Sequence, residues 1–189
     1  KIQVFKIKDS EPGAQFFLIS GPDENISTVG KIKENDSEID NVRFKFWSEF
    51  YEKLKEKSNI YLSTAPKPRT YISVSAGMRG VIYTCAAQNN SAQVEIYIDR
   101  GKEDGKETNL KIFREFEKNK EQIEKNFGNK LDWEDLPESR ACRIKLRSNL
   151  GGFRDEETWE DIHEFLVQNI IKLEHSTKKY IKNIDRLIG

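Results

Sequence analysis

The chain has 189 residues, enough for one well-buried domain alone or with an appendage, and its 32 Lys and Arg balance its 32 Asp and Glu. A net charge of zero excludes attraction of the whole molecule to nucleic acid or membrane, so any anion binding requires a local patch. Apolar residues make up 36% of the chain and aromatic residues 11%, which predicts a folded core and excludes general disorder.

Residues 1–20 predict a β-hairpin. Two strand-like runs, at 2–7 and 15–19, flank a turn segment in which Pro12 and Gly13 interrupt the chain. A two-stranded hairpin is only marginally stable by itself, so we expect it to pack on a partner.

Residues 21–39 form a polar segment that contains several residues disfavoured in helices and strands, such as Gly21 and Pro22. We therefore predict a linker or a long surface loop at this point. Because the chain opens at Lys1, directly before a strand, we also expect it to be part of a longer protein.

Residues 40–189 alternate between helical and strand-like hydrophobic periods and predict one domain. The expected elements, in chain order, are a helix from Asp40, strands at 71–75, 81–87 and 93–99, a helix at 104–127, a strand at 140–147 and a helix from Asp155. This α-β-β-β-α-β-α order predicts an α+β fold with an antiparallel four-stranded sheet, whose helices cover one face and leave the other partly open. Asp155 is the expected N-cap of the last helix and Gly128 the expected C-terminal cap of the second.

The last helix carries an apolar stripe from Trp159 to Leu173. A second stripe, formed by Tyr180, Ile184 and Leu187, either continues this helix or belongs to a separate short one. The second stripe is a candidate surface for a homodimer, or for packing against a part of the protein that lies upstream.

The chain shows no sign of a metal site, a cofactor site or a membrane anchor. Cys85 and Cys142 lie in strand-like apolar runs and predict buried free thiols in a reducing compartment, with a disulfide between them as the alternative. Neither has the spacing of a zinc site, and we expect His163 and His175 to be exposed on the last helix. No run approaches the about 18 apolar residues of a membrane helix, and no signal peptide is visible, so we expect a cytoplasmic protein without membrane contact.

The run at 140–147 carries the clearest functional signal. Arg143, Lys145 and Arg147 alternate with apolar residues, which places three cations in a row on the open face of the sheet. Aromatic side chains of neighbouring strands, either Tyr71 or Tyr83, lie further across, and bases stack on such rings while cations follow phosphates. The predicted contacts to DNA or RNA are Arg143, Lys145, Arg147, Arg79, Arg100, Arg154 and Tyr97. The alternative is an ordinary solvated salt bridge between Glu95 and Arg143.

Glu95 and Asp99 form a possible acidic site on the third predicted strand. A PD-(D/E)XK nuclease requires an Asp/Glu-x-Lys triplet, and no strand carries one. Nucleophile and phosphate-loop motifs are missing too, so we predict no catalytic residue, no metal and no cofactor. An enzyme site formed by Glu95, Asp99 and Arg143 is the least favoured interpretation, because Asp99 is expected to cap a loop or to pair with Arg100 or Arg140.

Five strings, taken in order, carry a family resemblance. They are Arg43-Phe44-Lys45-Phe46-Trp47, Val94-Glu95-Ile96-Tyr97-Ile98-Asp99-Arg100-Gly101, Leu131-Asp132-Trp133-Glu134, Arg140-Ala141-Cys142-Arg143-Ile144 and Asp155-Glu156-Glu157-Thr158-Trp159. Residues 40–180 resemble an uncharacterised family of bacterial and archaeal domains of unknown function, which commonly follow a PD-(D/E)XK nuclease-like domain. The resemblance implies that the hairpin at 1–20 is the end of that nuclease-like domain, and it transfers no catalytic residue.

The expected function is therefore that of a non-catalytic accessory domain that contacts nucleic acid through its basic strand. Any nuclease activity would belong to the domain upstream. The alternative is a protein-interaction or dimerisation module that makes no contact with nucleic acid.

Overall fold

A computed structural model of the chain describes residues 2–5, 13–16, 23–60 and 64–188, with side chains from residue 37 onward. The chain divides into two compact units, Lys1–Ile39 and Asp40–Gly189. The second unit has an α+β architecture, in which helices pack against a five-stranded antiparallel sheet.

The first unit contains a hairpin of strands β1 (Ile2–Phe5) and β2 (Gly13–Phe16), which pair antiparallel. Gly13 therefore lies in a strand, where we expected it in the turn. Helix α1 (Asp23–Lys57) spans the boundary between the units, so residues 23–39 are helical where we expected a linker or a long surface loop. The sequence of this segment has Ile26, Val29 and Ile32 at three-residue spacing among Lys and Glu residues that favour a helix, and the single Gly30 costs only about 1 kcal/mol.

The sheet of the second unit has five strands in the spatial order β3-β4-β5-β7-β6. Their bounds are β3 Tyr71–Met78, β4 Val81–Ala87, β5 Ala92–Ile98, β6 Asp132–Glu134 and β7 Cys142–Ser148. The prediction of four strands missed β6, an edge strand of three residues that is too short to show alternation. Its pairing with β7, which sets Trp133 opposite Ile144, depends on tertiary structure and is invisible in the local sequence.

The predicted helix at 104–127 is two helices, α2 (Gly105–Glu117) and α3 (Lys120–Phe127). The break lies at Asn119, whose side-chain amide donates to the Glu115 carbonyl and competes with the helical backbone pattern. Gly128 ends α3 in the left-handed conformation, at φ 86°, which confirms its predicted role as a cap.

The last helix, α4 (Trp159–Ile188), follows one 3-10 turn at Glu156–Thr158. Asp155 holds the N-cap position of the 3-10 turn that leads into α4, as predicted, but its side chain makes no capping hydrogen bond. The Asp155 side chain instead accepts a hydrogen bond from the Gly152 amide, 3.0 Å away. The second apolar stripe continues α4: Tyr180 and Ile184 are buried within the unit, and only Leu187 is exposed. This packing weakens the expectation of a dimer surface there.

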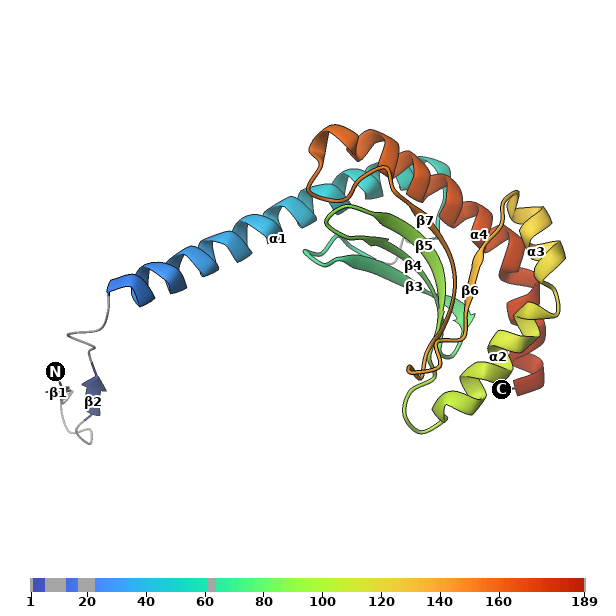
Figure 1. Cartoon of the computed structure of the whole chain (residues 1–189), viewed down its shortest axis with the longest axis horizontal. Helices are drawn as coiled ribbons and strands as arrows, with labels where there is room; N and C mark the ends of the chain where they lie inside the picture. Colours follow the sequence, from blue (N-terminus) through green and yellow to red (C-terminus); the bar gives the residue numbers. More distant parts are fainter. Residues whose placement is uncertain (1, 6–12, 17–22, 61–63, 189) are drawn as a thin grey trace. The chain divides into compact units, whose positions relative to one another are not determined.

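Helices cover one face of the curved sheet, and no helix covers the concave face of the described structure (Figure 1). Helix α4 contacts β3, β4, β5 and β7, while α2 packs beside it and α3 packs on α4. The buried core includes the rings of Phe46 and Trp159, whose centroids are 5.3 Å apart and join α1 to α4. Since each large buried apolar side chain contributes about 1.5–3 kcal/mol, this layer stabilises the sheet and leaves its concave face free for other roles.

Candidate nucleic-acid interface

The predicted basic strand is β7, and its cations lie on the open, concave face. Side chains alternate along a strand, so Arg143, Lys145 and Arg147 share one face while Cys142 and Ile144 enter the core. Across the ladder to β5 the cations face three open-face residues. The opposed pairs are Arg143 with Tyr97, Lys145 with Glu95 and Arg147 with Gln93.

Arg143 contacts both an aromatic ring and a carboxylate. Its guanidinium carbon lies 5.4 Å from the centre of the Tyr97 ring, within the range of a cation–π contact. Its Nε lies 3.8 Å from the Glu95 Oε2, so the salt bridge that we gave as the alternative is present, but it is too long for a hydrogen bond. This Nε is buried and has no hydrogen-bond partner among the described residues.

The other two cations of the row differ from each other. Lys145 Nζ lies 2.6 Å from the Glu134 Oε1, and only 15% of the lysine side chain is exposed. Arg147 is exposed and donates to the Ser91 hydroxyl at 3.0 Å, and no acidic partner for it occurs in the described part of the chain. The row is therefore partly neutralised, because the unpredicted strand β6 brings Glu134 beside it.

A hollow of about 310 Å³ lies on this face, next to Arg143. Its lining comes from β3, β4, β5, β7 and the turn after β4: Tyr71, Ile82, Thr84, Ala86, Gln88, Gln93, Glu95, Tyr97 and Arg143. We did not predict the β4 members, because Ile82 and Ala86 are apolar and hide the alternation of that strand. Tyr71 lies on this face, whereas Tyr83 enters the core and bonds the Thr177 hydroxyl at 2.9 Å.

Glu95 lies in this hollow and is only 6% exposed. Its Oε2 accepts a hydrogen bond from the Gln93 amide at 3.0 Å. Burial raises the pKa of Glu95 above the ordinary carboxyl value, although Arg143 and Lys145 act in the opposite direction. The nearby Thr84 Oγ1 is buried and has no hydrogen-bond partner among the described residues. The hollow therefore presents polar groups with unused hydrogen-bonding capacity.

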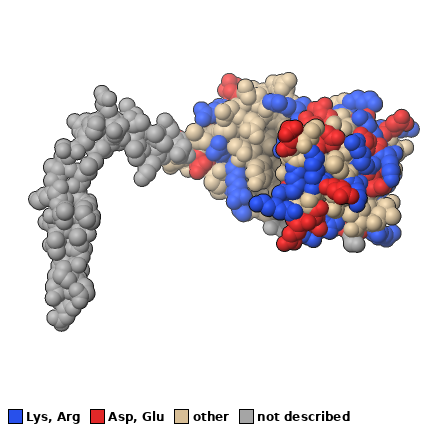
Figure 2. Space-filling model, turned by 60° about the horizontal axis from the view of Figure 1, so that its bottom comes forward, with Lys and Arg blue, Asp and Glu red and all other residues tan. Residues whose placement is uncertain are grey.

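Charge on the visible surface is mixed. In Figure 2, Lys and Arg side chains are interspersed with Asp and Glu, beside a tract of uncharged surface. An extended field of one sign is not present on this face. Binding of an anion here would depend on a few placed side chains.

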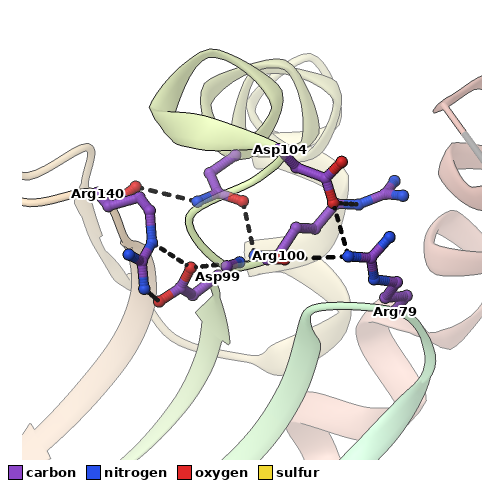
Figure 3. Close-up of polar contacts among 7 residues, drawn as sticks. Arg79, Asp99, Arg100, Asp104 and Arg140 are labelled. Carbon is purple, nitrogen blue, oxygen red and sulfur yellow. Dashed lines mark hydrogen bonds and ion pairs between the residues drawn. The ribbon is translucent and has the colours of Figure 1, made fainter.

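Three other predicted site residues, Arg79, Asp99 and Arg100, lie together at the end of the sheet where β5 stops and α2 begins (Figure 3). Asp99 accepts two hydrogen bonds from Arg140, at 2.7 and 2.6 Å, and a third from the Gly101 amide. The hydrogen bond from Arg140 is the main reason that the pKa of Asp99 lies below its usual range. The prediction that Asp99 pairs with Arg140 is thus confirmed.

Arg79 and Arg100 share the carboxylate of Asp104, at 3.2 and 3.1 Å. Buried Asn109 ties the network together, since it accepts from the Arg100 amide and donates to the Arg140 carbonyl (Figure 3). We define the corner network as Arg79, Asp99, Arg100, Asp104, Asn109 and Arg140. Its hydrogen bonds and ion pairs connect β5, α2 and the residues before β7, and the prediction that Arg79 and Arg100 contact nucleic acid stays a prediction.

The structure does not bring Glu95 and Asp99 together into one acidic site. Four residues along a strand separate their backbones by about 13 Å, and their partners differ. Arg154 also lies outside the lining of the hollow, with its guanidinium 5.8 Å from the centre of the Phe153 ring. No cluster of three or more metal-binding side chains occurs within residues 37–60 and 64–188.

His163 is buried, and our expectation of an exposed histidine was wrong at this position. Its ring lies 4.5 Å from the Phe46 ring and 6.1 Å from that of Trp159. Burial lowers the pKa of His163 to about 4, so the ring is neutral at pH 7. His175 is exposed, and both cysteines are buried.

Comparison with known protein families places the chain in one of them. The described helices include none that is long and apolar enough to cross a membrane. No curated protein and no solved structure matches the chain significantly. A family model described as "Domain of unknown function (DUF4268)" matches residues 42–181, which cover most of the α+β unit. The chain therefore belongs to this uncharacterised family.

Proposed function

We propose that this domain is a non-catalytic accessory module that binds single-stranded nucleic acid on the concave face of its sheet. The observation that carries the proposal is the contact between Arg143 and Tyr97 on a face that no described helix covers. Proteins that bind single strands combine stacking rings with cations that follow the backbone. Arg147 and Tyr71, both exposed, add a second cation and a second aromatic ring to this face.

The cations extend across the sheet. Lys67 and Arg69 line a second hollow, of about 340 Å³, which shares Tyr71 with the first. From β3 to β7 there are three strand spacings, or roughly 14 Å. A strand that runs from the β3 edge to β7 would meet cations at both ends and the Tyr97 ring of β5 between them.

Binding by this face is expected to be modest. Lys145 is paired with Glu134, so four cations remain for phosphate contacts: Arg143, Arg147, Lys67 and Arg69. For single strands this predicts a slope of about −2.8 in a plot of log affinity against log salt. A weak accessory contact suits a module that acts together with a catalytic domain.

The catalytic partner in this proposal is a PD-(D/E)XK nuclease-like domain upstream in the same protein. Its support is the sequence resemblance, together with the lack of an Asp/Glu-x-Lys triplet on any described strand of this chain. The accessory domain would then hold a strand for the nuclease-like domain to act on.

The test is a salt titration of binding to labelled single- and double-stranded DNA and RNA, followed by fluorescence anisotropy. It compares the unmodified chain with the variant Arg143→Ala/Lys145→Ala/Arg147→Ala. A matched control, Lys111→Ala/Lys118→Ala/Lys125→Ala, removes the same charge from α2, its C-cap residue and α3, on the other side of the sheet.

We expect single strands to bind best, the open-face variant to lose this binding and the control to keep it. Equal loss in both variants would mean that only total charge matters and would refute the assignment of the face. No binding at low salt would refute nucleic-acid binding and favour the protein-interaction module.

A further inference from the structure

Buried polar groups around Glu95 lack hydrogen-bond partners, and such groups do not stabilise a fold. We infer that the hollow beside Arg143 holds one guanine base of the bound strand, with the Glu95 carboxylate accepting hydrogen bonds from its Watson–Crick edge. This inference rests on the proposed function and specifies the ligand of the same face.

Glu95 has acceptor capacity to spare. Its Oε2 accepts a hydrogen bond from the Gln93 amide, and no described residue donates a hydrogen bond to its Oε1. The arginine nearby stands at 3.8 Å, beyond hydrogen-bonding distance. A carboxylate that is 6% exposed and incompletely paired destabilises a fold, and a ligand that donates to it recovers the loss.

Two further groups in the hollow lack a partner. Thr84, 4% exposed, has a buried hydroxyl that makes no hydrogen bond. The buried Nε of Arg143 makes no hydrogen bond either. Neither atom has a hydrogen-bond partner among the described residues, although the Arg143 Nε lies 3.8 Å from the Glu95 Oε2. Together with Glu95 they offer an acceptor, a donor and a hydroxyl that can act as either.

Guanine fits this set better than the other bases. Its N1–H and N2–H donors are adjacent and match the two oxygens of a carboxylate, while its O6 accepts from an arginine. Adenine, cytosine and thymine present no two adjacent donors on that edge. The rings of Tyr71 and Tyr97 at the hollow provide stacking surfaces, and its 310 Å³ is ample for one base.

The experiment uses the full chain and dT oligonucleotides that carry one central dG, deoxyinosine, dA or dC, at a fixed salt concentration. Deoxyinosine lacks only the exocyclic amino group of guanine, so it tests the N2–H contact. The variants are Glu95→Gln, Thr84→Val and, as a matched control, Glu134→Gln. Glu134→Gln makes the same change of charge on the same face but lies outside the lining of the hollow. A thermal melt of each variant verifies folding.

We expect dG to bind about tenfold more tightly than dT, since one bidentate pair discriminates at this level. The preference should fall with deoxyinosine, weaken in Thr84→Val and vanish in Glu95→Gln, while Glu134→Gln keeps it. Salt-sensitive binding without a guanine preference, or with a preference that Glu95→Gln leaves intact, would overturn this inference alone. A lack of binding to every oligonucleotide would overturn the proposed function as well.

Discussion

Two acidic residues, Glu95 within strand β5 and Asp99 directly after it, lie near arginines, and the two contacts differ. Asp99 at the end of the strand is saturated by Arg140 at 2.6–2.7 Å, whereas Glu95 in its middle stands 3.8 Å from Arg143. Asp99 belongs to the corner network, which joins β5, α2 and the start of β7. Glu95 belongs to an open face with unpaired groups around it. A saturated ion pair stabilises the fold, and an incomplete one leaves room for a ligand.

The largest expected effect lies next to the corner network, against Arg100, and comes from Gly80→Ala. Gly80 has φ +76°, and an added Cβ would lie 2.7 Å from the Arg100 Cα. We expect a loss of about 2–4 kcal/mol of unfolding free energy, from the left-handed backbone and the clash together. Urea denaturation measures it. Gly77→Ala is the control, because Gly77 has φ +92° and open space, so it should lose only about 1–2 kcal/mol. Equal losses would show that the close approach to Arg100 is unimportant.

The second-largest loss of stability is expected from Asp99→Asn. The change removes the charge that Arg140 pairs with and should destabilise the fold by about 2–3 kcal/mol, because the Asp99 side chain is mostly buried. Since the pKa of Asp99 is lowered in the folded state, its contribution is present above the ordinary value of 3.8 and is lost as the pH falls through the folded value. Thermal melts at pH 7 and at pH 3 would measure this. A variant as stable as the unmodified chain at pH 7 would contradict the structural role of the corner network.

Arg143→Ala should cost the fold less than about 1 kcal/mol, because the arginine is partly exposed and its ion pair is long. The same variant should weaken binding to single-stranded DNA several-fold. Parallel measurements of the melting temperature and of the dissociation constant separate the two effects. A large loss of stability would show that Arg143, like Arg140, mainly stabilises the fold, and would contradict the difference between the Glu95 and Asp99 ion pairs.

Glu95→Gln is expected to have the smallest effect on stability, and to raise it where the other changes lower it. Burial raises the pKa of Glu95, so the folded chain holds its proton more tightly than the unfolded chain. Stability therefore falls as the pH rises from the ordinary value of 4.5 through the folded value. A glutamine removes this penalty, and the melting temperature should rise slightly at pH 7 and less at pH 4. Destabilisation at pH 7 would indicate that Glu95 is a structural group.

The sequence predicts the backbone of the site better than its chemistry. Alternation alone placed Arg143, Lys145 and Arg147 on the open face, because a period of two is a local property of the chain. The neutralisation of Lys145 by Glu134 escaped prediction, since it depends on β6, whose three residues are held by pairing with a distant strand.

Packing from other elements explains the remaining errors. His163 was expected on an exposed surface because the stripe of α4 was judged from that helix alone, but α1 adds the Phe46 and Phe50 rings beside it. The difference between the Asp99 and Glu95 pairs is likewise a matter of side-chain geometry. Spacing along β5 indicates which residues can face an arginine, not how closely they approach it.

The most direct test follows the backbone amide resonances of the chain as a single-stranded oligonucleotide is added. The account predicts shifts in β5 and β7, around Glu95, Tyr97 and Arg143, and little change in the corner network. Shifts that cluster at Asp99 and Asp104, or none at saturating oligonucleotide, would contradict the claim that the concave face is the binding surface.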